Sequence, residues 1–172
     1  LGRSRMTSRS DVNQLVSANR QITALANREL ASFLASLGTD DPYLIRDALL
    51  RYMPDMVARF GDLSATVAAE WFEQVRAKSV PGGFNARLGD GPPSAAVQES
   101  TRWAVGPLFE DDPDGMLARL SGSVQRYVAD TSRGTIARNV SLDPRKPRFG
   151  RVPSGAKTCA WCSLLASRGF VY

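Results

Sequence analysis

The chain of 172 residues contains no histidine and only two cysteines. Without an imidazole group it lacks the commonest general base, and neither a phosphate-binding glycine loop nor a strained nucleophile turn is found. The usual sets of catalytic residues are therefore missing, and we expect a protein that is not an enzyme. Two cysteines only three positions apart cannot hold a domain together, which argues against a fold built on disulfide bonds.

Long hydrophobic runs are also missing. No stretch of eighteen or more apolar residues occurs, so we expect no membrane-spanning segment, and no apolar stretch follows the first arginines as a signal peptide would require. The chain as a whole is 43% hydrophobic and 23% charged, which are ordinary values for a globular protein. A chain of this length can bury a sizeable core.

The net charge of +5 is unevenly distributed along the chain. Three arginines lie in residues 1–9, and residues 133–157 carry seven cations against one acid, Asp143. The body between these two segments is acidic. A chain with basic ends and an acidic body indicates a polyanionic partner, of which nucleic acid is the most obvious.

Apolar residues recur at helical spacing through the first half of the chain and predict a mainly α-helical domain. A first long helix is expected to begin at a cap formed by Ser10 or Asp11 and to end at Gly38. Pro42 predicts the start of a short second helix. Pro54 predicts the start of a third helix, which ends near residue 78.

The second half of the domain follows the same pattern after an interruption. Residues 80–94 are rich in glycine and proline and predict a loop or hinge. Ser94 predicts the start of a fourth helix that ends at Gly106, and Pro113 predicts the start of a fifth that reaches about Val140.

Two sets of residues could be mistaken for functional sites. Trp71, Phe72 and Trp103 lie in phase with the apolar stripes, so we interpret them as core residues rather than as interface anchors. The acidic clusters at residues 40–41 and 110–112 each precede a proline at a predicted helix start. We interpret them as helix caps, because acidic side chains stabilise helix N-termini.

The character of the chain changes after Asp143. We therefore expect three parts: a basic arm over residues 1–9, the helical domain over residues 10–142, and residues 143–172. The last part comprises a basic linker and the start of a small α/β module, only partly present, that zinc would stabilise.

Cys159 and Cys162 form a Cys-x-x-Cys knuckle that can provide two ligands to one tetrahedral zinc ion. Four ligands are needed, so the sequence contains half of a site. A redox pair and plain burial remain as alternatives, although the basic, proline-broken segment before the knuckle is unlike the strand that precedes a redox pair.

The basic linker predicts contact with nucleic acid, because its positive charges can follow a phosphate backbone. A solvated linker is the alternative. No helix-turn-helix or base-stacking motif accompanies the charge, so the contact would be with double-stranded DNA and independent of its sequence. The residues predicted to make it are Arg138, Arg145, Lys146, Arg148, Arg151 and Lys157.

Three segments carry a resemblance to a known family. Arg102-Trp-Ala-Val-Gly-Pro-Leu-Phe109, Arg151-Val-Pro-Ser-Gly and residues 158–172, which contain the cysteine knuckle, resemble the MuF-like minor head proteins of tailed phages that infect actinobacteria. In that family a histidine and a Cys-x-Cys pair usually follow the knuckle. By resemblance they would complete a zinc site begun by Cys159 and Cys162, with the remaining ligands beyond residue 172.

The resemblance implies a low-copy virion protein inside the capsid, bound to the portal, that acts in head assembly and in genome packaging or ejection. Major capsid or scaffold protein would be further partners, and the host cytoplasm would be its location during assembly. We expect the long first helix to dock on the portal through Ile22 and Leu25. Two alternatives remain: a nucleic-acid-binding zinc protein unrelated to a virion, and a thiol oxidoreductase.

Overall fold

The computed structural model describes residues 7–147, 149–150 and 170–171 of the chain. These residues are mainly helical, as predicted, and none of their helices is long and apolar enough to cross a membrane. The elements are α1 (Arg9–Ser36), α2 (Pro42–Ala77), α3 (Ser94–Ala104), the short 3-10 helix η1 (Gly106–Glu110), α4 (Pro113–Leu142) and two antiparallel two-residue strands, β1 (Phe149–Gly150) and β2 (Phe170–Val171).

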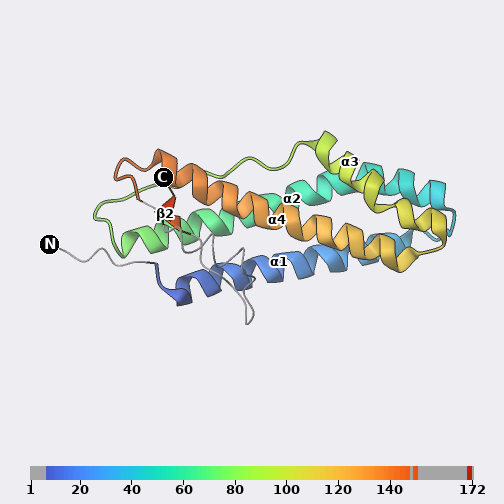
Figure 1. Ribbon diagram of the computed structural model, residues 1–172, viewed down its shortest axis with the longest axis horizontal. Coiled ribbons are helices and arrows are strands. Elements are labelled where there is room, and N and C mark those ends of the chain that lie inside the picture. Colours follow the sequence, from blue (N-terminus) through green and yellow to red (C-terminus); the bar gives the residue numbers. More distant parts are fainter. Residues whose placement is uncertain (1–6, 148, 151–169, 172) are drawn as a thin grey trace.

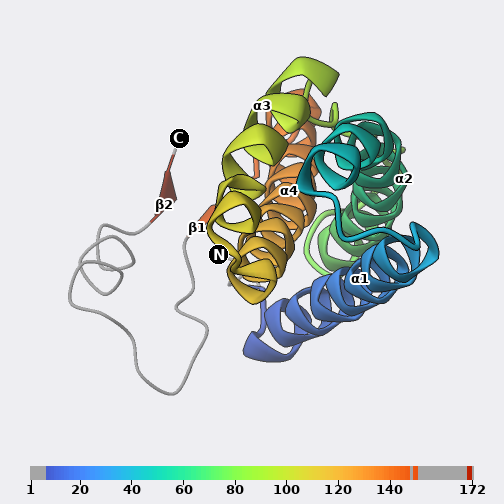
Figure 2. The ribbon, with the colours of Figure 1, turned by 90° about the vertical axis from the view of Figure 1, so that its right-hand side faces the viewer.

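The helices form an elongated bundle (Figures 1 and 2). α1 runs in one direction along the long axis and α2 returns beside it. The chain then runs forward again, first as an extended segment over residues 80–93 and then as α3, before α4 returns in the direction of α2 (Figure 1). Three long helices thus share the bundle with a fourth leg that is helical over only part of its length.

Acidic and hydroxyl side chains cap the long helices. Ser8 caps α1 in a capping box with Asp11, so the cap lies two or three residues earlier than the predicted Ser10 or Asp11. Asp41 accepts hydrogen bonds from the backbone at the start of α2, and Asp112 accepts one from the Gly115 N–H at the start of α4. The interpretation of these two aspartates as caps is confirmed.

Pro54 does not begin a helix but lies inside α2, so the predicted second and third helices are one helix of 36 residues. A proline inside a helix removes one backbone hydrogen bond and costs about 3 kcal/mol. The apolar stripe continues in phase across Pro54, with Leu49 and Met53 before it and Val57 after it, all buried. Burial of this continuous stripe offsets the cost of the proline, because each large apolar side chain contributes about 1.5–3 kcal/mol.

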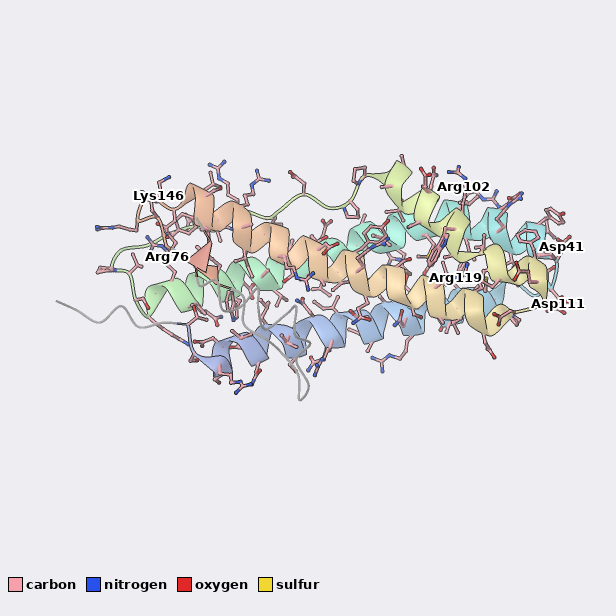
Figure 3. The ribbon with its side chains drawn as sticks, viewed as in Figure 1. Asp41, Arg76, Arg102, Asp111, Arg119 and Lys146 are labelled. Carbon is pink, nitrogen blue, oxygen red and sulfur yellow. The ribbon has the colours of Figure 1, made fainter. Side chains whose placement is uncertain are left out.

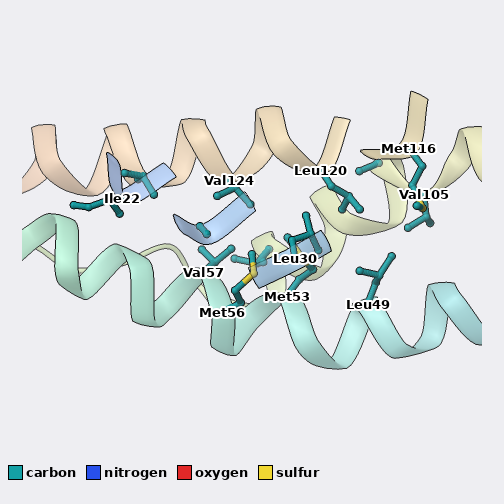
Figure 4. Close-up of a cluster of buried hydrophobic side chains, with 14 residues drawn as sticks. Ile22, Leu30, Leu49, Met53, Met56, Val57, Val105, Met116, Leu120 and Val124 are labelled. Carbon is teal, nitrogen blue, oxygen red and sulfur yellow. The ribbon is translucent and has the colours of Figure 1, made fainter. Parts of the chain in front are cut away.

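The apolar core lies in the half of the bundle where all four helices meet (Figure 4). Leu30 of α1, Met56 of α2 and Leu120 of α4 are fully buried, and Val97 brings α3 against them. Because α3 covers only this half, four helices enclose the core here. Toward the other end the core is enclosed by three helices. The buried members are Ile22, Ala26, Leu30, Leu49, Met53, Met56, Val57, Val97, Ala104, Val105, Met116, Leu120, Val124 and Val128.

The remaining half of the bundle is packed with small and polar side chains. Ser64 of α2 donates a hydrogen bond to the backbone carbonyl of Val128 at 2.8 Å, and Asn19 of α1 donates one to Ser132 at 3.1 Å. Gly61 of α2 faces the side chain of Thr131 of α4, whose Oγ1 would lie 3.5 Å from an added Cβ. Hydroxyl groups in this region find partners within the helices, which makes their burial tolerable.

The sequence predicted a loop or hinge over residues 80–94, and the structure has neither helix nor strand over residues 80–93. This segment is extended and hydrogen-bonded to α4. The side-chain amide of Asn139 forms two reciprocal hydrogen bonds of 2.7 Å with the backbone N–H and carbonyl of Arg87. Gly89 lies so close to Thr135 that an added Cβ would meet the Thr135 backbone nitrogen at 2.7 Å. We call residues 80–93 the strap, because these bonds hold it along α4.

The three aromatic residues predicted to lie in the core have different environments. Phe72 is buried, as predicted. Trp71 is partly buried and donates its indole N–H to the Asp11 carbonyl at 2.7 Å. Trp103 is 61% exposed, so its prediction was wrong. Six residues separate Trp103 from Val97, which puts Trp103 about 120° around α3 from the buried stripe of Val97 and Thr101. Its side chain therefore points away from the core.

Asp11 joins the beginning of α1 to the end of α2. Its carboxylate is buried and accepts hydrogen bonds from the Lys78 ammonium and from the hydroxyl and backbone N–H of Ser8. The bond from Lys78, followed by those from Ser8, lowers the pKa of Asp11 from 3.8 to about 2. The native state therefore favours the ionised form of this carboxyl group.

We predict that this carboxylate contributes to stability above pH 4 and that the contribution disappears as the pH falls from about 4 to about 2. The sign follows from linkage, because a group whose pKa is lower in the folded state stabilises the fold only while it is ionised. Asp11→Asn should therefore unfold at lower urea concentration than the wild type at pH 6. The two proteins should converge near pH 2, and an equal difference at both pH values would contradict the assignment.

Candidate nucleic-acid interface

Basic residues gather at the end of the bundle where α2 and α4 finish. Arg76 of α2 and Lys146, which follows α4, both lie at this end, far from Asp41 and Asp111 at the other (Figure 3). The strap adds Arg87, which is hydrogen-bonded to Asn139 near the end of α4. We call this the basic end of the molecule.

A buried ion pair organises the basic end. Arg76 donates from Nε to Asp143 Oδ2 at 2.6 Å and from Nη2 to Oδ1 at 3.2 Å, while its Nη1 donates to the Gly82 carbonyl at 2.7 Å. The guanidinium also lies over the Phe84 ring, 5.1 Å from its centre. All three guanidinium nitrogens thus have acceptors, which is the condition under which a buried charge is tolerated.

The ion pair shifts the pKa of each partner in the direction that keeps Arg76 and Asp143 charged. Hydrogen bonding to Arg76 lowers the pKa of Asp143 against the opposing effect of its complete burial, and the same bond raises the pKa of Arg76. Asp143 was predicted to begin the basic linker. It is completely buried and is anchored to the helical bundle through Arg76.

The turn after α4 exposes two cations. Asp143 accepts a bond from the Arg145 N–H at 2.9 Å on its side chain and one from the Lys146 N–H at 3.0 Å on its carbonyl. Lys146 has a left-handed backbone with φ of 49°, which closes this turn. The side chains of Arg145 and Lys146 are exposed, and neither forms an ion pair within the described part of the chain.

Arg138, also predicted to contact nucleic acid, is partly occupied. Its Nη1 lies 3.3 Å from both carboxylate oxygens of Asp90, an exposed residue of the strap. Such a long, exposed pair is worth little and can exchange for a phosphate. Arg87 was not predicted, although it is exposed and unpaired among the described residues, because the strap was interpreted as a hinge. The signal was Thr135 and Asn139, polar residues on the buried stripe of α4.

The other predicted site residues lie elsewhere. Arg148, Arg151, Lys157 and both predicted zinc ligands, Cys159 and Cys162, fall outside the described residues. Within the residues that the structure does describe, no group of three or more cysteine, aspartate or glutamate side chains could hold a metal ion.

The two residues predicted to bind a protein partner have opposite environments. Ile22 is 5% exposed and belongs to the apolar core, so a partner cannot reach it in the folded bundle. Leu25, three residues later on α1, is 45% exposed. The long apolar stripe of α1 is thus used by its own bundle, and this corrects the prediction for Ile22.

The arrangement suits binding of an anionic polymer. Arg87, Arg145 and Lys146 are three exposed cations on two segments that Asp143 and Asn139 fix to the end of α4. Their side chains can reach phosphate oxygens without breaking an ion pair seen in the structure. These three cations do not lie on a helix that could enter a groove of DNA. The contact would therefore neutralise phosphate charge rather than recognise bases.

We predict that Asp143→Asn lowers the melting temperature by about 10 °C, since loss of one partner leaves a buried guanidinium without its counter-charge. Asp90→Asn is the matched control at the same end, because Asp90 forms an exposed pair with Arg138. It should shift the melting temperature by about 1 °C or less. Equal shifts in thermal unfolding followed by circular dichroism would contradict an organising role for Asp143.

Comparison with known proteins adds a family. The model of a family described as VG15 protein matches residues 6–172, which is nearly the whole chain. No curated protein and no solved structure matches it.

Proposed function

Because the chain belongs to the VG15 family, a viral gene protein family whose membership suggests a phage-encoded protein, we propose that it is a minor capsid protein of a phage head. It acts in head morphogenesis beside the portal, inside the capsid of the virion, after assembly in the host cytoplasm. It contributes to genome packaging or ejection through sequence-independent contact with double-stranded DNA. The resemblance to MuF-like minor head proteins of actinobacterial phages supports this more specific assignment.

One observation carries the DNA contact: the three exposed cations of the basic end, Arg87, Arg145 and Lys146, are held in place yet unpaired among the described residues. A solvated linker would not need the Asp143 turn or the Asn139 bonds that fix them. Arg138 joins them when a phosphate replaces Asp90. Arg148, Arg151 and Lys157 extend the same positive charge along the sequence.

The role is structural rather than catalytic. Its partners are the portal protein, with the major capsid or scaffold protein as a further partner, and DNA. A nucleic-acid-binding zinc protein outside any virion is a weaker candidate, because it does not account for the family. A thiol oxidoreductase has only the cysteine spacing in its favour.

We predict that DNA binding depends on salt through the basic end. Three phosphates neutralised by Arg87, Arg145 and Lys146 correspond to a slope of about −2.7 in a plot of log affinity against log salt. Reversing all three charges to glutamate should weaken binding and reduce the slope by about that amount. Fluorescence anisotropy with two duplexes of unrelated sequence measures both quantities, and the two duplexes should bind equally.

The control reverses three exposed arginines away from the basic end, Arg20, Arg28 and Arg102, and changes the net charge by the same amount. Its slope should stay close to that of the wild type. If both triple variants lose the same affinity, the effect belongs to net charge and the basic end has no particular role.

We also propose that Cys159 and Cys162 bind zinc together with two ligands beyond residue 172. The full-length gene product, purified without chelators under reducing conditions, should then contain about one zinc per chain by atomic emission. Cys159→Ser with Cys162→Ser should abolish it and unfold the C-terminal part, because structural zinc contributes on the order of 10 kcal/mol to a small domain. Zinc near zero in the wild type would exclude the site.

A further inference from the structure

Four large apolar side chains are exposed at the end of the bundle opposite the basic end. They are Tyr43, Leu44, Trp103 and Phe109, with exposed fractions of 59%, 57%, 61% and 44%. They come from the first turn of α2, the end of α3 and η1. We call these four side chains the tip patch. Tyr43 and Phe109 contact each other edge to face, with ring centres 5.2 Å apart, so α2 and η1 present their aromatic rings together.

Arginine side chains lie over two of the aromatic rings. The Arg119 guanidinium lies 4.7 Å from the centre of the Trp103 ring and donates to the Trp103 backbone carbonyl at 3.4 Å. Arg46 lies 5.4 Å from the Tyr43 ring. Tryptophan, tyrosine and arginine are the residues that most often dominate the energy of protein interfaces. Rings that already contact neighbouring side chains lose less freedom on binding than isolated ones.

The surroundings of the tip patch are acidic. Residues 40–47 and 102–119 contain seven carboxylates against three arginines. Asp41 and Asp112 are used as helix caps, but Asp40, Glu110 and Asp114 are exposed and form no ion pair with a described residue. A protein surface complementary to this tip is therefore apolar at its centre and carries lysine or arginine around it.

We propose that the tip patch is the surface through which the chain docks on the portal protein, and that the portal offers apolar side chains ringed by basic residues there. This inference rests on the proposed function. It replaces the stripe of α1 as the docking element, because Ile22 is buried and leaves Leu25 alone on that face. The two ends of the molecule then have separate partners, with the portal at the tip patch and DNA at the basic end.

The experiment measures binding of the full chain to two purified proteins from the same phage, the portal and the major capsid protein, at low and moderate salt. The test variant combines Trp103→Ser with Phe109→Ser. The matched control combines Leu25→Ser with Leu63→Ser, which removes two exposed leucines on the flank of the bundle. All four side chains are exposed, so both variants should unfold thermally like the wild type.

We expect the wild type and the control to bind the portal equally. The tip variant should bind at least about 30-fold more weakly, as for loss of an interface hot spot. Moderate salt should weaken wild-type binding, because the acidic surroundings contribute to it.

Unchanged portal binding by the tip variant would overturn the inference while leaving the proposed function standing. The wild type could instead bind the capsid protein and not the portal, with the tip variant losing that binding. This outcome would overturn the portal as partner in this inference and in the proposed function. Binding of the wild type to neither protein would do the same.

Discussion

The ion pair between Arg76 and Asp143 is the interaction on which one whole end of the molecule depends. Its atoms connect the end of α2, the beginning of the strap, the end of α4 and the turn that follows it. Removing two charges from water is unfavourable, and it is tolerated here because each guanidinium nitrogen has an acceptor and the Phe84 ring covers the group. A lysine could not replace this arginine, since a single ammonium group lacks the fixed planar fork.

The two halves of the bundle are packed in different ways. Where α3 is present, leucine, methionine and valine side chains fill a conventional core. Where the strap replaces a helix, α4 turns Thr135 and Asn139 toward a backbone rather than toward apolar side chains. An extended segment cannot bury a wide apolar face, so polar groups that bind its backbone take that position. The transition explains why the apolar stripe of α4 weakens toward its C-terminus.

Local signals in the sequence predicted the helices well, because caps and apolar periodicity act over a few residues. These local signals gave wrong predictions where contacts between residues far apart in the sequence determine the structure. Pro54 would end an isolated helix, but its neighbours Met53 and Val57 are buried against other helices, and that burial outweighs the proline. Trp103 was assigned to the core for its size, but it lies about 120° around α3 from Val97 and points away from the buried stripe. Of the candidate interface, Arg145 and Lys146 were named from charge alone, whereas Arg87 required knowledge that Asn139 binds the strap.

The chain enters and leaves the bundle at the same end. The start of α1 lies near the end of the bundle where α4 finishes and the two short strands pair (Figure 1). Among the described residues, the opposite end holds the connection from α1 to α2 and the connection from α3 through η1 to α4. α2 spans about 54 Å between the two ends at 1.5 Å per residue. A fluorescent label or fused domain attached through residues 7–9 would therefore start beside Asp11 and Lys78 and leave Trp103 unobstructed. The bundle thus holds the tip patch about one length of α2 away from the end where the described chain enters and leaves it.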